Sequence, residues 1–358
     1  MLANRTATPC SRTGAKVINI GPTPNPQPGG KFVFTASHPS THRVTLLRNR
    51  LDVPRSHDGP GCFHGGPSSY LSEPFFIDIH FFASAAHGLC ANRDVKLDMR
   101  IIAIANQKGG VGKTTSAMNL SACLARLGVK VLLIDLDPQA NATSGLGMTD
   151  ENAKSMYSAL VGGEDPREAI VPTEVQGLSM IRSNQDLAGC EIELAQAGNH
   201  LVRLREVLQP IRDSGDFDYA ILDCPPSLGV LMTSSLSAAD ELLVPIQCEY
   251  FGLEGLSKIV HVVQQIRECG ANPGLLLEGI VMTMFDSRAN LAQQVVGDVR
   301  NYFAEIVYQT VIPRTIRLGE APSFGKPIID YEPNGRGAQA YKALAEEFLA
   351  RHAPKPSA

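Results

Sequence analysis

The sequence predicts an α/β fold, a mostly parallel twisted sheet with helices on both faces. Apolar, strand-like runs alternate with helical patterns from Arg100 almost to the C-terminus. The runs are nearly continuous in apolar residues, which is typical of strands that are buried on both faces of a sheet. A glycine-rich turn that contains two lysines joins the first run to the first helical pattern. Together these features favour a parallel sheet with a ligand site at its carboxyl edge.

Each expected element follows from its own stretch of sequence. The seven expected strands are Ile101–Ala105, Val129–Ile134, Leu178–Ile181, Tyr219–Leu222, Glu241–Ile246, Leu275–Val281 and Ile306–Ile312. The expected helices lie near Ser116–Leu127, Leu187–Gln209, Val230–Ala238, Leu253–Cys269, Leu291–Phe303 and Gly337–His352.

Residues 1–98 differ from the rest of the chain. They hold ten prolines, six of the nine histidines, and ten Lys or Arg against six Asp or Glu. No sustained helical or strand period emerges, so we expect this segment to be disordered or loosely structured. Met99 stands directly before the first expected strand, and we hypothesise that residues 1–98 are a start-site extension. The folded domain is then residues 99–358.

Composition excludes several classes of protein. No apolar run approaches the roughly 18 residues of a membrane span, and the N-terminus lacks the apolar core of a signal peptide. None of the eight cysteines forms a C-x-x-C pair, so we expect buried thiols in a reducing cytoplasm. After residue 98 the chain has 22 Lys or Arg against 30 Asp or Glu, so any DNA binding must come from a local patch.

The glycine-rich turn has the composition of a phosphate-binding loop. It reads Asn-Gln-Lys-Gly-Gly-Val-Gly-Lys-Thr-Thr over residues 106–115. Amides of the turn, the helix dipole and the charge of Lys113 all favour a phosphate anion, and the Thr114 hydroxyl can bind Mg²⁺. The usual pattern has glycine where this chain has Gln107, and a second lysine, Lys108, starts the loop. On its own, Lys108 could equally be a solvated loop residue.

Carboxylates follow two other expected strands. Asp135 and Asp137 end the second strand and, two residues apart, should point the same way. Asp223 follows four apolar residues at the end of the fourth strand, as a Walker B aspartate does. Alternatively, the two aspartates are ordinary solvent-exposed residues at the point where the chain leaves the strand. The three strand ends together predict a site for a Mg²⁺-nucleotide.

With these motifs in view, residues 99–352 resemble the ParA/Soj family of chromosome- and plasmid-partitioning ATPases. This family lies within the wider ParA/MinD group of P-loop NTPases with a deviant Walker A motif. The matching blocks are Ala105–Thr115, Asp135–Gly145, Leu222–Ser227, Thr283–Arg288, Ile312–Arg317 and Glu320–Ile328.

The resemblance implies a role for each matching residue. ATP phosphates would be bound by Lys108, Gly109, Gly110, Val111, Gly112, Lys113, Thr114 and Thr115. Thr114 and Asp223 would hold Mg²⁺. Lys108 would reach across a nucleotide-sandwich homodimer to the partner's phosphates, and Asp137 would position the attacking water. Pro313 and Thr315 would contact adenine, although the family often has asparagine at the latter position.

The family also implies partners. Arg288 and Arg317 lie where related proteins place arginines for non-specific DNA binding, although ordinary surface ion pairing is an alternative. The expected function is ATP-dependent DNA partitioning, with hydrolysis stimulated by a ParB/Spo0J-type centromere-binding protein. The protein would then be cytoplasmic and nucleoid-associated, without a membrane partner.

Three other functions remain open from the sequence. A MinD-like membrane ATPase needs a basic amphipathic C-terminal helix, whereas Glu346 and Glu347 would face anionic lipid badly. An iron–sulfur carrier would need cluster cysteines, and Cys224 and Cys248 are not obviously placed for one. A DNA-coating module could use ATP only for assembly, but Asp137 favours hydrolysis.

Overall fold

The computed structural model describes residues 31–36, 43–49, 75–78, 99–150, 154–249, 252–303 and 305–353. The chain divides into two units, Met1–Cys90 and Ala91–Ala358. In the first unit, the strands β1 (Lys31–Ala36), β2 (Arg43–Asn49) and β3 (Phe75–Asp78) form an antiparallel sheet in that order. The rest of residues 1–98 lies outside the described residues, and the start-site extension stays a prediction.

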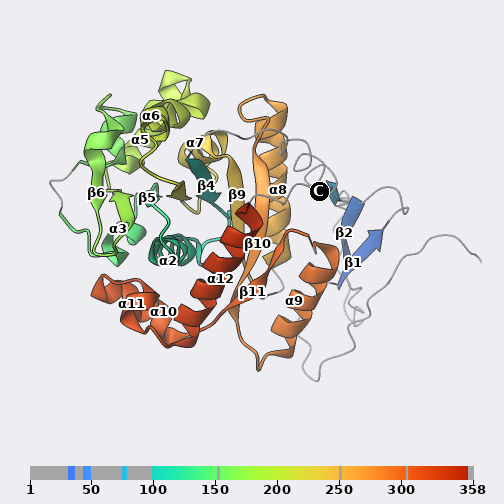
Figure 1. The fold of residues 1–358 in the computed structure, drawn as a ribbon. Coiled ribbons are helices and arrows are strands. Elements are labelled where there is room, and N and C mark those ends of the chain that lie inside the picture. The colour runs from blue at the N-terminus through green and yellow to red at the C-terminus, as the bar shows by residue number, and fades with distance from the viewer. Residues whose placement is uncertain are drawn as a thin grey trace, which may run out of the picture. The chain divides into compact units, whose positions relative to one another are not determined.

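The second unit is built on one eight-stranded sheet (Figure 1). Its strands are β4 (Arg100–Ile104), β5 (Val131–Asp135), β6 (Ile170–Pro172), β7 (Leu178–Ile181), β8 (Tyr219–Asp223), β9 (Glu241–Gln247), β10 (Leu276–Phe285) and β11 (Val307–Pro313). Their order across the sheet is β11-β10-β9-β4-β8-β5-β7-β6. Every neighbouring pair is parallel except β6 with β7. The predicted mostly parallel sheet is confirmed, and the carboxyl ends of its parallel strands meet at one edge.

Helices connect the strands. The longer ones are α2 (Lys113–Arg126), α5 (Leu187–Ala197), α6 (His200–Ser214), α7 (Val230–Ala238), α8 (Gly252–Glu268), α9 (Asn290–Tyr302) and α12 (Arg336–His352). The shorter ones are α3 (Asn141–Gly145), α4 (Met156–Leu160), α10 (Ile316–Glu320) and α11 (Ile328–Tyr331), with the 3₁₀ helices η1 (Pro166–Ala169) and η2 (Ala321–Phe324).

Alternate side chains of the central strand pack on different helices. Ile102 and Ile104 of β4 join one core with α2 and α12, which pack against each other. Helix α7 packs on β4, helix α8 packs on β9, and helix α6 packs on α7. Ile101 and Ala103, the intervening residues of β4, are also fully buried. Because both faces of β4 are covered, only its carboxyl end can present groups to a ligand.

The sequence did not predict β6 or the short helices, and two of the predicted elements differ in extent. The expected helix Leu187–Gln209 is two helices, because Gly198 adopts φ 69°, in the left-handed region where glycine ends a helix without strain. The strand β10 continues four residues beyond the predicted end, to Phe285. This extension carries Thr283 and Met284 to the edge where the phosphate loop lies.

Candidate functional site

The glycine loop connects the end of β4 to the start of α2. Gly110 has φ 75° and Gly112 has φ 87°, so both lie in the left-handed region that favours glycine. Gly112 is the N-cap of α2, and its carbonyl accepts the first helical hydrogen bond, from Ser116 N at 2.9 Å. The first amides of α2, which have no partner within the helix, therefore start directly beyond the loop, where an anion is favoured.

The two lysines of the loop lie in different environments. Lys113 is buried, and its Nζ donates to the main-chain carbonyl of Lys108 at 3.3 Å. Burial lowers the pKa of Lys113, while the negative charges of Asp223 and Asp137 act in the opposite direction. Lys108 is part-exposed, and its Nζ lies 3.7 Å from Oε2 of Glu249. Lys113 thus faces the carboxylates inside the site, whereas Lys108 lies at its rim.

Asp223 ends β8, next to the loop strand β4. Its side chain is fully buried, and neither carboxylate oxygen makes a hydrogen bond of ordinary geometry within the described part of the chain, although the Thr114 hydroxyl is close enough to lower its pKa as a donor. Burial raises the pKa of Asp223 well above its ordinary value, and the Asp135 charge adds to the rise. The Thr114 hydroxyl and the Lys113 ammonium oppose that rise. Two unpartnered carboxylate oxygens beside a hydroxyl are hard oxygen donors of the kind that Mg²⁺ prefers.

Asp135 and Asp137 serve different purposes. Asp135 accepts hydrogen bonds from Thr143 N at 2.9 Å, from Thr143 Oγ1 at 2.8 Å and from Asp137 N at 3.1 Å. Burial raises the pKa of Asp135 to about 6, and these hydrogen bonds limit the rise. Asp135 therefore holds the turn after β5, although the sequence pattern had both aspartates pointing toward the site.

Asp137 is positioned by that turn. Its Oδ1 accepts from Gln139 N at 3.0 Å, and its main-chain carbonyl accepts from Ser183 Oγ at 2.6 Å. The residue is 7% exposed, so the second carboxylate oxygen is the part of Asp137 that remains for a ligand or water. Thr143 and Ser183, which fix this turn, were not singled out from the sequence.

The residues expected at adenine and DNA lie farther along the sheet. Pro313 ends β11, and the Thr315 side chain caps α10 by accepting from Arg317 N at 3.1 Å. Arg288 pairs with Asp286 at 2.9 Å, and Arg317 pairs with Glu320 at 2.7 Å. Both arginines are well exposed, and in this structure each forms an ordinary surface ion pair, which was the alternative to DNA binding.

Similarity to known proteins shows to which family this chain belongs. A family model described as an AAA domain matches residues 99–276. The chain is 49% identical over 257 residues to the chromosome partitioning protein ParA of Myxococcus xanthus, covering 72% of this chain and 90% of that protein. It is also 49% identical over 252 residues to the sporulation initiation inhibitor protein Soj of Bacillus subtilis, covering 70% and 98%.

The chain belongs to the ParA/Soj family of chromosome-partitioning ATPases. A solved structure similar to this ParA/Soj-family chain is cobyrinic acid a,c-diamide synthase from Mycobacterium smegmatis, with bound ATP analog and magnesium. It is 36% identical with a TM-score of 0.61, and the match covers 71% of this chain and 95% of that one. The predicted P-loop ATPase fold is therefore confirmed.

The C-terminal helix of this family member does not fit the MinD-like alternative. Tyr341, Leu344 and Phe348 on α12 are buried in the core beneath the sheet. Glu347 accepts from the main-chain amides of Gln309 at 2.7 Å and Thr310 at 2.9 Å on β11. The apolar face of α12 is thus already covered by protein. No helix in the described ranges is long and apolar enough to span a membrane.

The contacts of three side chains with the main chain around the glycine loop were not predicted from the sequence. Asn106 donates to Pro245 O at 2.8 Å and accepts from Lys108 N at 3.0 Å. Gln247 and Thr283 donate to loop carbonyls from the ends of β9 and β10. A polar residue directly after an apolar run was the available signal for both strand residues, but the sequence does not say which strand ends lie beside the loop.

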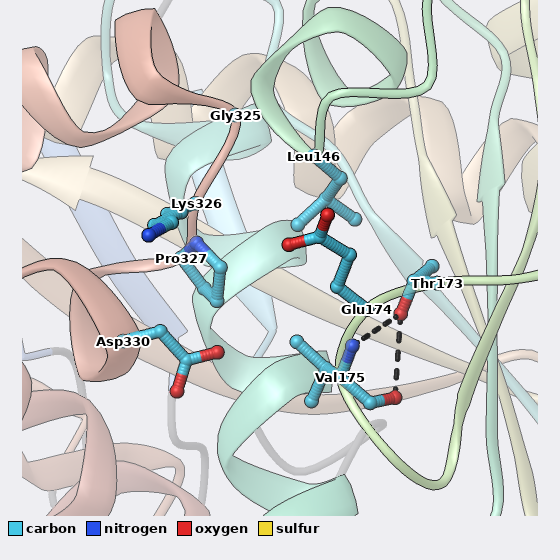
Figure 2. Close-up of a pocket in the computed structure, with 8 residues that line it drawn as sticks. All are labelled: Leu146, Thr173, Glu174, Val175, Gly325, Lys326, Pro327 and Asp330. Carbon is cyan, nitrogen blue, oxygen red and sulfur yellow. Dashed lines mark hydrogen bonds between the residues drawn. The ribbon is translucent and has the colours of Figure 1, made fainter.

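A separate hollow of about 180 Å³ lies away from the phosphate loop (Figure 2). It is lined by Leu146, Thr173, Glu174, Val175, Gly325, Lys326, Pro327 and Asp330. Asp330 pairs with Arg126, the last residue of α2, whereas the glycine loop precedes the first residue of that helix. None of the predicted site residues lines this hollow.

Proposed function

We propose that this chain binds ATP with Mg²⁺ at the carboxyl edge of its sheet and hydrolyses it to ADP and phosphate. The observation that carries the proposal is the buried, unpartnered carboxylate of Asp223, which lies at the end of β8 with Thr114 and Lys113 close enough to alter its pKa. An unpaired buried carboxylate is costly unless a ligand completes it. A Mg²⁺ ion held by Asp223 and Thr114 would neutralise that charge and the charge of the β- and γ-phosphates.

The residues of the loop then divide the work. The amides of Gly109 to Thr115 and the Lys113 ammonium would bind the phosphates, with Pro313 and Thr315 beside adenine. Asp137 would orient the attacking water. Lys108, partly exposed at the rim, would act on the nucleotide of a second subunit, so that pairing of subunits completes each catalytic site.

Partners follow from the family. The relative from Myxococcus xanthus is named as a chromosome partitioning protein, and we infer that this chain acts in DNA partitioning with a ParB-type protein that stimulates hydrolysis. The ATP-bound homodimer would bind DNA without sequence preference in the cytoplasm, at the nucleoid. Arg288 and Arg317 would then exchange their present carboxylate partners for DNA phosphates. Residues 99–358 would suffice for this activity, with residues 1–98 an extension.

One set of measurements on the purified full chain tests the function. ATP hydrolysis is followed with Mg²⁺ and with EDTA, and subunit mass is measured by light scattering with and without ATP. We expect Mg²⁺-dependent hydrolysis and a dimer only with ATP. Hydrolysis at full rate by a strict monomer would overturn the sandwich mechanism.

DNA binding needs its own experiment. Co-sedimentation with plasmid DNA should increase with ATP, fall steeply between low and moderate salt, and ignore sequence. The Arg288→Ala and Arg317→Ala variants should bind less DNA while keeping ATP binding. Equal binding by the nucleotide-free protein, or binding that persists in high salt, would contradict this part of the proposal.

A further inference from the structure

Two neighbouring side chains donate hydrogen bonds to two consecutive carbonyls of the glycine loop. Gln247 Nε2 donates to Gly110 O at 2.8 Å, and Thr283 Oγ1 donates to Val111 O at 2.8 Å. Gln247 ends β9, and Thr283 lies opposite it in the pairing of β9 with β10. We call this pair of residues the loop clamp. Neither residue has been given a role in the site described above.

The clamp determines where the loop amides point. In a trans peptide the carbonyl and the following N–H point in opposite directions, and no described peptide bond is cis. Holding the Gly110 and Val111 carbonyls against the sheet therefore turns the N–H groups of Val111 and Gly112 away from the sheet. That is the direction in which a phosphate must be received by backbone donors.

A glycine-rich loop needs such an external restraint. Gly109, Gly110 and Gly112 allow many backbone conformations, and ordering them costs more conformational entropy than ordering any other residue type. Added Cβ atoms on Gly109 or Gly110 would meet no atom within 4 Å, so there is open space where a side chain would stand at these two residues. Side-chain hydrogen bonds therefore select one conformation: Asn106 and Lys113 bond the main chain of Lys108, and the clamp bonds the carbonyls of Gly110 and Val111.

The clamp residues are themselves held firmly. Thr283 is 2% exposed, and its hydroxyl also lies 3.0 Å from Ile246 O, an alternative acceptor for the same proton. Met284, the next residue, has φ 52°, a left-handed conformation that is uncommon and unfavourable for methionine. The second N–H of the Gln247 amide can donate to Met284 Sδ, at 3.1 Å. An unfavourable backbone conformation retained next to the loop is consistent with a functional constraint on this strand end.

We propose that Gln247 and Thr283 are positioning residues for phosphate binding. They aim the Val111 and Gly112 amides at the nucleotide before it arrives, so that binding does not have to order the loop. This inference rests on the proposed ATP site, and it names two residues that act through the loop backbone without contacting the nucleotide.

Matched substitutions test the clamp. Thr283→Val keeps the shape and removes the hydroxyl, and Gln247→Leu removes both amide donors. Each should weaken binding of fluorescent methylanthraniloyl-ATP roughly tenfold, the loss expected for one intramolecular hydrogen bond. Thr283→Ser, which retains the hydroxyl, should restore binding to within about threefold of the parent protein. KM should rise more than kcat falls, because the amides bind ground state and transition state alike.

Two controls lose comparable hydrogen bonds elsewhere. Thr173→Val deletes a hydroxyl that lies 2.9 Å from Leu178 O, and Gln293→Leu deletes an amide that donates to Ser287 O at 2.7 Å. Both controls should bind methylanthraniloyl-ATP as the parent does, whatever their effect on thermal unfolding.

Hydrogen exchange separates positioning from general stability. In the nucleotide-free clamp variants, exchange should accelerate in a peptide that covers residues 106–115 and stay unchanged in α12. Clamp variants that lower the melting temperature but bind nucleotide like the parent would overturn the proposal. Absence of nucleotide binding by the parent protein would instead refute the proposed function, so the two failures are distinguishable.

Discussion

The Lys113 ammonium donates a hydrogen bond to the main-chain carbonyl of Lys108 at 3.3 Å, which joins the two lysines of the glycine loop. One lysine is buried beside carboxylates, and the other reaches outward to Glu249. Lys113, the first residue of α2, is thus bonded to the main chain at the start of the loop. If a phosphate takes up the ammonium, as we propose, we expect the loop start to lose this contact, so that nucleotide binding and the position of Lys108 would be linked.

Substitution of the two lysines should separate binding from hydrolysis. Lys113→Met removes a buried charge-assisted donor worth about 1.5–3 kcal/mol, so ATP affinity should fall roughly 10- to 100-fold. Lys108→Ala should change affinity less than about threefold but abolish hydrolysis. Equilibrium fluorescence with methylanthraniloyl-ATP and a phosphate-release assay measure the two effects. Lys130→Ala, an exposed lysine just before β5, is the control. Equal loss of affinity in both loop variants would contradict the division of roles.

Asp137→Ala should stop the reaction after ATP has bound. The turn that holds Asp137 is fixed by its main chain and by Asp135, so the loop geometry should survive the loss of this side chain. We expect kcat to fall at least about 100-fold, as for the loss of a group that positions water, and the ATP-bound dimer to accumulate. Size-exclusion chromatography with light scattering detects the dimer. Asp213→Ala, on the exposed side of α6, should behave as the parent; a monomeric Asp137→Ala protein in ATP would count against this role.

Removal of the two buried aspartates on neighbouring strands should have different effects on the stability of the protein. Asp135 and Asp223 are paired in register on β5 and β8. Asp135→Ala leaves two amide N–H groups and one hydroxyl proton without an acceptor and should lower the free energy of unfolding by about 2–4 kcal/mol. Asp223→Ala removes an unpartnered carboxylate, so the metal-free protein should be unchanged or about 1 kcal/mol more stable. Urea denaturation in EDTA measures both, and Mg²⁺ should stabilise the ATP complex of the parent but not of Asp223→Ala. Equal destabilisation by both changes would refute the assignment.

Two glycines of the loop should differ in their tolerance of a side chain. Gly112 has φ 87°, so Gly112→Ala should cost about 1–2 kcal/mol of folding free energy. Gly109 lies outside the left-handed region and has open space around it, so Gly109→Ala should change stability by less than about 1 kcal/mol. Urea denaturation of the nucleotide-free protein checks the pair. A destabilised Gly109→Ala protein would show that the loop backbone is not as described.

The end of α12 makes stability depend on pH. His352 Nε2 lies 2.6 Å from Glu241 Oε2, and the Glu278 carboxyl accepts from the Tyr308 hydroxyl on the adjacent strand. Burial raises the pKa of Glu278 to about 7, from an ordinary value of 4.5. Burial lowers the pKa of His352, but the hydrogen bond to Glu241 and the nearby negative charges outweigh it, so the pKa is raised.

The raised pKa values of Glu278 and His352 both make the folded protein less stable as pH rises. Between about pH 4.5 and 7 the folded protein binds more protons at Glu278 than the unfolded chain does, so stability falls as pH rises through this range. The stabilisation from His352 is complete below its unfolded pKa of 6.5 and is lost as pH rises through the raised folded value. Thermal unfolding from pH 5 to 8 should therefore show a falling melting temperature, to which Asp135 and Asp223 also contribute.

The Glu278→Gln variant isolates the contribution of Glu278 to the fall of melting temperature with pH. The amide does not titrate, so the fall in melting temperature between pH 5 and 7.5 should be shallower than in the parent. Glu346→Gln, an exposed carboxylate on α12, is the control and should leave the slope unchanged. A parent protein that becomes more stable as pH rises through this range would overturn the account.

The sequence by itself determined most of the strands and longer helices and the place of the glycine loop between a strand and a helix. Apolar runs located seven of the eight strands of the main sheet, because a buried strand is encoded by its own consecutive residues. The glycine loop, Lys113 and Asp223 were also readable, since each adjoins a strand end within a few residues. Helix α5 and helix α6 merged in the prediction because the break at Gly198 depends on a single left-handed residue.

Only the tertiary structure decided which strands lie beside β4 and which side chains meet there. Gln247 contacts a loop residue 137 positions away, and Thr283 contacts one 172 positions away. It also decided that Asp135 holds a turn while Asp223 stays unpartnered, and that α12 is buried. Local patterns depend on neighbours in sequence, whereas strand order and hydrogen-bond partners depend on distant segments that meet only when the chain folds.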